Sequence, residues 1–406
     1  MKNDKVAMFD QFPPPRDERC PFDPPPELVR RLHEEPISKI RIWDGTEAWL
    51  ITRFDDGRAA LSDDRFSADP RRPGFPEKNI AYASTIGTDR NLRVMDNPEH
   101  DLQKRKMIRD FTVKRVEELR PYVQEVVDRL IDEMLLRPKP IDLISNFAVS
   151  LPTLVICELL GVPYEDREFF SERTEAVLSS PTAEEAIAAG NDLSEFIERL
   201  IDLKIASPAN DLISRMVHDY MLKGEFGRDE LVSLGRLLLI AGHNTTASMI
   251  GLSTLFILQN PKVAAEFRSN KDTAFFRNAV DELLRYLGTN HAGRRRVAIS
   301  DVVIGGQLIK AGEGIIVQNN VMDRDETVFT NADQFDSRRP NARATSAFGY
   351  GIHQCAGQSL ARMELVVVHS TLWTRIPNLR LAIEFDQVPF FEHGPSYKLK
   401  SLPVTW

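Results

Sequence analysis

The stretch FGYGIHQCAG, residues 348–357, ends an irregular segment that runs over residues 323–354 and is followed at once by a helical pattern. Irregular segments of this length are uncommon in compact domains unless they serve a function. Gly349 and Gly351 permit a tight turn with positive φ. The cysteine stands just ahead of the expected helix, where the helix dipole favours a thiolate. Gly357 leaves room for a flat group near the backbone. The stretch therefore predicts a thiolate held on a rigid loop towards a planar metal cofactor.

Residue types alone leave three interpretations of Cys355 open. A buried free cysteine is the usual fate of a single cysteine. A nucleophilic pair with His353 would need an unusual loop, because the two residues are only two positions apart. A cysteine thiolate is also an axial ligand of haem iron. Zinc is disfavoured, since Cys20 and Cys157 offer no spaced partner motif.

The composition is that of a folded protein. The chain has 406 residues, of which 42% are hydrophobic and 28% charged, and its net charge is −8. This balance argues against nucleic-acid binding as the main task, which needs basic clusters. Three cysteines cannot form a disulfide scaffold, and the N-terminus lacks an apolar core of signal-peptide length. We expect a reducing compartment, the cytoplasm.

The pattern along the chain predicts a mainly α protein with a small β portion. Residues 1–26 are proline-rich and are expected to meander over the surface, whereas residues 27–406 are expected to form one domain. Residues 39–52 read as two strands around the turn Asp44-Gly45. Helical periodicity predicts helices at 98–111, 113–136, 143–160, 164–179, 183–206, 211–222, 228–260, 262–269, 272–287 and 356–376, with short strands after Gly293 and from Phe390 onward.

One uncharged stretch, residues 237–258, is long enough to cross a bilayer as a helix. Four polar residues lie at its middle: His243, Asn244, Thr245 and Thr246. A helix that is apolar all round can equally be buried at the centre of a large protein. We therefore predict a central buried helix and no membrane.

The cysteine stretch fits the pattern F-G-x-G-x-H-x-C-x-G and resembles the haem-binding loop of the cytochrome P-450 family. The resemblance extends over nearly the whole chain in order and spacing, and it is strongest with the soluble bacterial, Streptomyces-type branch. It is carried by MDNPEH (95–100), FTVKRVEELRP (111–121), AGHNTT (241–246), ELLR (282–285), FDSRR (335–339) and LPVTW (402–406). It implies the cytochrome P-450 fold, with haem b between the central long helix and the helix after the cysteine.

The resemblance also implies roles for single residues. Cys355 becomes the axial ligand of the haem iron, and Glu282, Arg285 and Arg339 form a buried charge network that holds the cysteine loop. Lys104 stands where the family usually has arginine, which exchanges a bidentate contact for a point charge. The residues implied in cofactor binding are His100, Lys104, Arg296, Phe348, His353 and Gly357.

On the central helix the resemblance implies the oxygen-activating positions. Thr245 matches the family threonine that controls proton delivery to dioxygen, and Gly242 would let the helix open locally beside it. Asn244 stands where the family has an acid, and an amide cannot ionise to relay protons. Either Asn244 only caps a loosened turn while water or His243 takes over, or oxygen activation is slower and less coupled.

Substrate contacts are placed by resemblance alone. They suggest an apolar organic molecule with a polar handle, although a surface or second-shell role for Asn290 and His291 is an open alternative. The expected pocket residues are Tyr82, Ile86, Val177, Ile240, Ala241, Asn290, His291 and Ser396.

The resemblance implies a monooxygenase that hydroxylates or oxidatively demethylates a small molecule. The chain carries no flavin or nicotinamide fingerprint, so electrons are expected from a ferredoxin and a ferredoxin reductase docking on a basic face. Two alternatives stay open: a nitric-oxide reductase of the fungal heme-thiolate type that uses NADH directly, and a haem-binding sensor or carrier without turnover. The candidate docking residues are Lys104, Arg105, Lys106, Arg109, Arg343 and Arg362.

Overall fold

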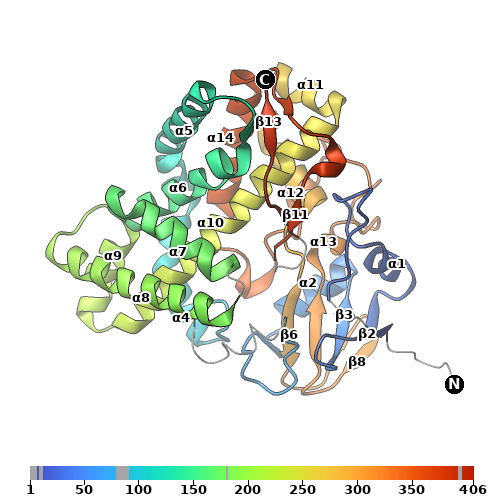
Figure 1. Ribbon diagram of the computed structural model, residues 1–406. Coiled ribbons are helices and arrows are strands. Elements are labelled where there is room, and N and C mark those ends of the chain that lie inside the picture. The colour runs from blue at the N-terminus through green and yellow to red at the C-terminus, as the bar shows by residue number, and fades with distance from the viewer. Residues whose placement is uncertain (1–6, 9–11, 79–90, 180–181, 392–395) are drawn as a thin grey trace.

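The computed structural model describes residues 7–8, 12–78, 91–179, 182–391 and 396–406. Helices make up most of the molecule, and a mixed β-sheet flanked by α1 and α2 lies at one side (Figure 1). The α-helices are α1 (Pro26–Glu34), α2 (Phe54–Ser62), α4 (Glu99–Met107), α5 (Val113–Leu136), α6 (Ser150–Leu160), α7 (Arg167–Ser179), α8 (Ala183–Ala206), α9 (Leu212–Asp219), α10 (Arg228–Gln259), α11 (Pro261–Ser269), α12 (Thr273–Leu287), α13 (Asn319–Met322) and α14 (Gln358–Arg375). Short helical turns are η1 (Ile108–Phe111), η2 (Ile144–Ala148), η3 (Tyr164–Asp166), η4 (Met221–Lys223), η5 (Ala342–Ala344), η6 (Gly351–His353) and η7 (Phe385–Gln387). The predicted fold class is confirmed.

Local signals explain where several helices begin. Asp211 caps α9 by accepting a hydrogen bond from the Ser214 amide at 2.7 Å, and Asp272 caps α12 by accepting one from the Ala274 amide at 2.9 Å. The helices expected between residues 98 and 287 are found, with shifts of a few residues at their ends. The sequence analysis missed α1 and α2, which are each only 9 residues long.

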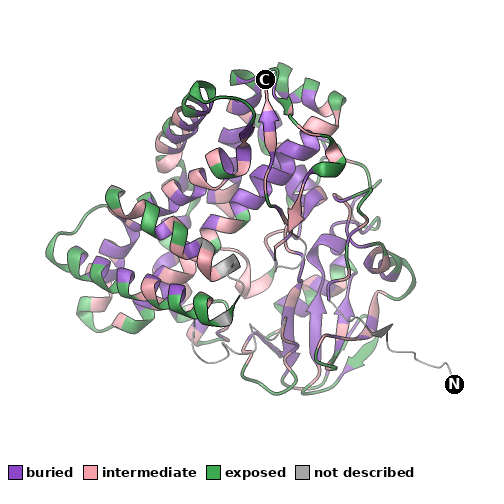
Figure 2. Cartoon of the chain, in the orientation of Figure 1, coloured by how far each residue is buried: buried purple, intermediate pink, exposed green. Residues whose placement is uncertain are grey.

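The uncharged stretch lies in α10, which runs through the middle of the helical part (Figure 1). Every residue from Thr246 to Ile257 is buried, as Figure 2 shows for this part of the helix. Helices α6, α8, α12 and α14 pack against it and cover its apolar surface on several sides. The prediction of a central buried helix is confirmed. In the described part of the chain, no helix has the length and apolar character that spanning a membrane requires.

The main sheet has the strand order β1-β2-β3-β9-β6-β4. Strands β2 and β3 form the predicted antiparallel hairpin, in which Gly45 has a φ of +83°. Strand β9 pairs in parallel with β3 and antiparallel with β6. The strands are β1 (Ala7–Met8), β2 (Ile37–Arg41), β3 (Glu47–Ile51), β4 (Phe66–Ser67), β5 (Ile141–Asp142), β6 (Arg294–Ala298), β7 (Val302–Ile304), β8 (Gln307–Ile309), β9 (Gly314–Val317), β10 (Arg380–Leu381), β11 (Phe390–Phe391), β12 (Lys398–Leu399) and β13 (Pro403–Thr405).

The N-terminal segment is tied into the fold more firmly than a surface meander. Strand β1 extends the main sheet by pairing with β2. Arg16 is buried, donates to the Gly288 carbonyl at 2.9 Å, and lies 3.8 Å from the centroid of the Tyr397 ring. The side chain of Arg16 is therefore in the protein interior, so this stretch does not run over the surface alone. The division into residues 1–26 and 27–406 stays a prediction.

Candidate active site

The loop that carries Cys355 lies between η6 and α14. The Cys355 amide donates to the Phe348 carbonyl at 2.9 Å and closes the loop. Gly349 and Gly351 have φ values of +73° and +71°, as predicted. A Cβ on Gly351 would lie 2.2 Å from the Leu61 carbonyl oxygen of α2, so only glycine permits this close approach. The turn is held rigid by its own hydrogen bond and by α2.

The environment of the Cys355 thiol differs from the expectation. Burial raises its pKa, while the Arg294 guanidinium and the Gly357 amide lower it in part. Burial therefore opposes the charged form of the thiol, against the effect expected from a position near a helix start. Cys157 is a buried core residue whose pKa burial raises to about 12, and Cys20 is exposed.

Several cationic and imidazole groups gather beside the loop. The His100 and His353 rings have centroids 4.4 Å apart. Lys104 donates to the carbonyls of Ile352 and Gln354, on either side of His353. Burial lowers the pKa of His353 to about 2, with Arg296, His100 and Lys104 adding repulsion. Such a cluster favours a bound anion, and the carboxylates of a porphyrin meet that requirement.

The sequence analysis missed Arg294. Its Nε is buried and has no acceptor among the described residues. A Cβ built on Gly349 would lie 3.4 Å from this nitrogen, so the guanidinium lies against the cysteine loop. The sequence could have indicated this residue, because side chains alternate along a strand and residues 294 and 296 of β6 therefore share a face. The prediction of Arg296 for the cofactor side therefore applies to Arg294 as well.

The structure brings Glu282, Arg285 and Arg339 together. Arg285 binds Glu282 through two hydrogen bonds of 2.7 and 2.8 Å, and the Arg339 Nε lies 3.0 Å from both Glu282 oxygens. Arg285 also donates to the carbonyls of Asp323 (2.7 Å) and Ala332 (2.8 Å). Because these acceptors belong to the segment that leads to the cysteine loop, the network joins that segment to α12.

On α10, Ala241 and Thr245 are exposed although they lie near the middle of a largely buried helix. The Thr245 hydroxyl donates to the Ala241 carbonyl at 3.0 Å. The side-chain oxygen of Asn244 accepts a hydrogen bond from Lys398 at 3.3 Å. The helix is continuous through Gly242, where a Cβ would lie 3.3 Å from Ile156 of α6. Glycine at this position permits the close packing of α6, and its role in a local opening of the helix stays a prediction.

The expected pocket residues fall into three groups. Tyr82 and Ile86 lie outside the described residues. Val177 and Ile240 are partly buried and pack against the helical core. Asn290, which is half-buried, forms an isolated antiparallel bridge with Ser396 outside the named strands.

The prediction that His291 lines the substrate pocket stays a prediction. His291 is buried, with a ring centroid 5.7 Å from that of Tyr397. The alternative of a second-shell role fits this position, because the imidazole is packed against an aromatic ring in the protein interior.

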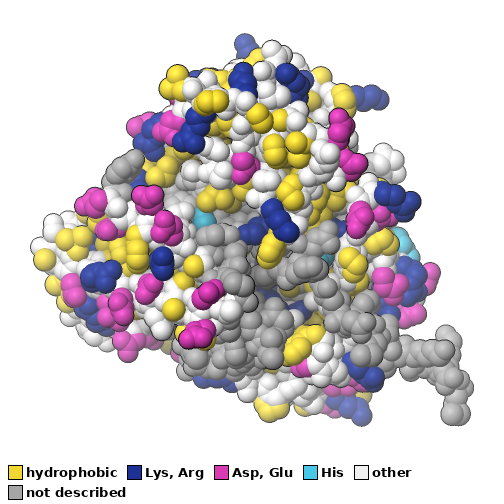
Figure 3. All heavy atoms as spheres, in the orientation of Figure 1, with side chains coloured by type: hydrophobic (Ala, Val, Ile, Leu, Met, Phe, Trp, Pro, Cys, Tyr) yellow, Lys and Arg dark blue, Asp and Glu magenta, His cyan; other side chains and the backbone are white. Residues whose placement is uncertain are grey.

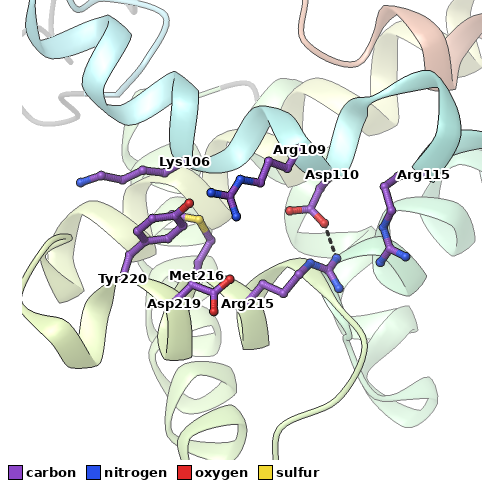
Figure 4. Close-up of a pocket in the computed structure, with 8 residues that line it drawn as sticks. All are labelled: Lys106, Arg109, Asp110, Arg115, Arg215, Met216, Asp219 and Tyr220. Carbon is purple, nitrogen blue, oxygen red and sulfur yellow. Dashed lines mark ion pairs between the residues drawn. The ribbon is translucent and has the colours of Figure 1, made fainter.

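A shallow cavity of about 200 Å³ lies elsewhere, between α4–η1 and α9–η4, and Figure 4 shows its lining. Asp110 and Arg215 form an ion pair across it. Arg109 points into the space between these elements (Figure 4). Acidic and basic side chains are interspersed on the face shown in Figure 3. The cavity is lined by Lys106, Arg109, Asp110, Arg115, Arg215, Met216, Asp219 and Tyr220.

The site residues fit a haem. A cysteine on a rigid loop offers the axial ligand, the cations beside the loop offer partners for two carboxylates, and Ala241 and Thr245 are exposed on α10. At Gly357 a Cβ would meet only the Cys355 sulfur and Phe111, both at 4.0 Å, so a flat group has room beside the backbone. Fold and site together define a haem-thiolate protein.

Comparison with known proteins identifies the family. The family model described as Cytochrome P450 matches residues 169–403. Cytochrome P450-SU2 of Streptomyces griseolus is 45% identical over 395 residues, which are 97% of this chain and 96% of that protein. The crystal structure of GfsF, a cytochrome P450 of Streptomyces halstedii, has a TM-score of 0.92 at 42% identity and covers 98% of this chain and 100% of its own.

Mycinamicin VIII C21 methyl hydroxylase of Micromonospora griseorubida, solved with mycinamicin VIII, has a TM-score of 0.91 at 37% identity, over 99% of this chain and 100% of its own. The chain belongs to the cytochrome P450 family. It is a monooxygenase with a haem-iron cofactor. The names of these relatives give no support to the alternative of a nitric-oxide reductase of the fungal type.

Proposed function

We propose that this monooxygenase binds haem b through Cys355 and hydroxylates or oxidatively demethylates a small organic molecule. The observation that carries the proposal is the pairing of a rigid cysteine loop with the cations Lys104, Arg294 and Arg296 and the imidazoles of His100 and His353. Haem bound there supplies the iron at which dioxygen is activated. Arg294 and Arg296 would bind the propionates through forked guanidinium groups, while Lys104 fixes the loop through its carbonyls.

Thr245 is proposed to move protons on the oxygen side. Its hydroxyl proton is engaged by the Ala241 carbonyl, which leaves the oxygen lone pairs free to accept. Rotation of the hydroxyl turns the same group into a donor towards the exposed face of α10. Asn244 cannot ionise, so it can orient the neighbouring groups but cannot relay protons itself. Asn244→Asp tests this, because a carboxylate that relayed protons would change the product formed per electron pair.

We propose a ferredoxin and its reductase as the electron source, docking beside the cysteine loop. Two of the six candidate cations are unsuitable: Lys104 binds the loop, and Arg362 is buried against Asp281 at 2.6 Å. Arg343 is 69% exposed, and Arg109 lines the cavity of Figure 4. These two, with Arg105 and Lys106, are the cations that an acidic partner could reach.

We propose a cytoplasmic location because none of the three cysteines forms a disulfide. Cys20, Cys157 and Cys355 are all free thiols, and a reducing compartment keeps them so.

Two spectra test the proposal. The carbon-monoxide difference spectrum of reduced holoenzyme should show the thiolate-type band, and Cys355→Ser should lose it. Titration with a compound library should then identify the substrate class through a low-to-high-spin change. The library should include vitamin D3, mycinamicin VIII and filipin I, which the names of relatives and solved structures provide. A wild-type band without thiolate character would refute the assignment of Cys355.

A further inference from the structure

The hairpin of β11 and β12 brings a lysine to the central helix. Phe391 pairs with Lys398 across the hairpin, and the Lys398 ammonium lies 5.4 Å from the Phe391 ring centroid. The same ammonium donates to the Asn244 side-chain oxygen at 3.3 Å. The two residues are 154 positions apart, so this contact exists only in the folded chain.

Three contacts fix the strand that carries Lys398. Leu399 is buried, and β12 packs against α10. The Tyr397 amide donates to the Thr289 carbonyl at 2.9 Å, and Ser396 bridges to Asn290. Because the backbone on both sides of Lys398 is anchored, the Lys398 Cα is held beside α10, and only the freedom of its side chain is lost when the ammonium binds Asn244.

The lysine determines how the Asn244 amide is oriented. An ammonium group has three donors and no acceptor, so only the amide oxygen of Asn244 can face it. The amide nitrogen is then directed away from the hairpin and remains a donor. A hydrogen bond from a charged donor is about twice as strong as a neutral one, which holds this orientation. The Asn244 backbone is also fixed, since its carbonyl accepts from the Ser248 hydroxyl at 2.7 Å.

We propose that Lys398 is a positioning residue for oxygen activation. It orients the Asn244 amide and brings a fixed positive charge to the turn that carries Thr245, where an acid would bring a negative one. No bond is made or broken at Lys398. The inference rests on the proposed roles of Thr245 and Asn244 and adds a residue outside the central helix.

The first test measures charge rather than turnover. Azide and imidazole are titrated against ferric holoenzyme, and the ratio of the two affinities reports the local potential. Lys398→Met should lower the preference for the azide anion about fivefold, whereas Lys398→Arg should keep it within about twofold. Lys400→Met is the matched control, because this exposed lysine lies two positions along the same segment. An unchanged ratio in Lys398→Met would overturn the inference.

The second test is a double-mutant cycle between positions 244 and 398. A carboxylate introduced by Asn244→Asp would pair with Lys398, so its effect on product formed per electron pair should depend on whether Lys398 is present. We expect the effects of Asn244→Asp in the wild-type and Lys398→Met backgrounds to differ at least about threefold. If the two substitutions change the product formed per electron pair independently of each other, a contact between the two side chains is contradicted.

Thr245→Ala separates this inference from the proposed function. If Thr245→Ala lowers product per electron pair and Lys398→Met changes neither readout, only the role of Lys398 fails. If Thr245→Ala has no effect, the proposed role of the central helix fails as well. The carbon-monoxide spectrum of each variant verifies that the holoenzyme is folded, and Lys398→Arg supplies a second variant with the charge retained.

Discussion

Replacing Glu282 by alanine should prevent this protein from holding haem. The change removes five hydrogen bonds, two from Arg285, two from Arg339 and one from the Asp336 amide. It also leaves two guanidinium groups buried without their carboxylate. Breaking a buried ion pair costs about 3–5 kcal/mol, and here two cations lose the same partner. A cost of about 5 kcal/mol or more is comparable with the whole stability of a typical protein.

The geometry also predicts an order among the three members. Arg339→Ala leaves the two-bond pair of Glu282 and Arg285 intact, but it strips the Thr330, Asn331 and Gln334 carbonyls of a donor. Arg285→Ala leaves Glu282 paired with Arg339 and strips the Asp323 and Ala332 carbonyls of a donor. Both arginine variants should therefore lose less stability than Glu282→Ala. Glu282→Ala should be most severe, because it alone leaves uncompensated charge.

A surface pair offers the matched control. Arg120 and Glu117 have the same spacing and a 2.6 Å contact, but their side chains are 29% and 43% exposed. Glu117→Ala should therefore cost less than about 1 kcal/mol. The assay compares haem per polypeptide, the carbon-monoxide band and thermal unfolding across the four variants. Haem-loaded Glu282→Ala protein that unfolds within about 1 kcal/mol of the Glu117→Ala variant would refute the reasoning.

Three further changes have defined outcomes. Burial raises the pKa of Glu364 from 4.5 to about 8, so its contribution to stability is present below pH 4.5 and lost as the pH rises through 8. Between pH 6 and pH 9 the free energy of unfolding should therefore fall by about 3 kcal/mol less in Glu364→Gln than in the wild type, as measured by denaturant unfolding. Burial lowers the pKa of His369 from 6.5 to about 3, so its contribution to stability is present above pH 6.5 and lost as the pH falls through 3. Between pH 7.5 and pH 4 the free energy of unfolding should fall by about 3 kcal/mol less in His369→Gln than in the wild type, in the same assay. Gly351→Ala should reduce haem content, because the added Cβ would lie 2.2 Å from the Leu61 carbonyl oxygen; a Gly306→Ala control, whose φ is also positive at +82° but whose Cβ meets nothing within 4 Å, should keep its haem.

Long elements with strong periodicity could be predicted from the sequence. α5, α8 and α10 are long enough for the helical spacing of their apolar residues to repeat over many turns. α1 and α2 have only 9 residues each, which is too few turns for such a pattern to be recognised. In α10 the apolar run alone was ambiguous between a membrane and a core. Its polar cluster pointed to the core, and the helices that pack on it confirm that outcome.

For the site, the sequence could predict local geometry where the residues lie within one segment. The Cys355 loop and the pair of Glu282 and Arg285 are local patterns, so their spacing carries the geometry. Contacts between distant segments were missed, such as that of Lys398 with Asn244, because residue types give no register between a hairpin and a helix. For the same reason the sequence left His291 open between the pocket and a second-shell role, because Tyr397, which its ring contacts, lies far along the chain.

The two departures from the family pattern share one physical feature in the proposed site. Lys104 replaces an arginine that would bind the cofactor carboxylates with a fork, and Arg294, from a strand outside that motif, brings such a fork to the same loop. Asn244 replaces an acid, and Lys398, from outside the central helix, brings a cation to its side-chain oxygen. Arg294 and Lys104 thus contact the same cysteine loop at different positions, whereas Lys398 binds Asn244 directly. The effect of restoring an acid at 244 should therefore depend on Lys398, and the effect of restoring arginine at 104 should depend on Arg294.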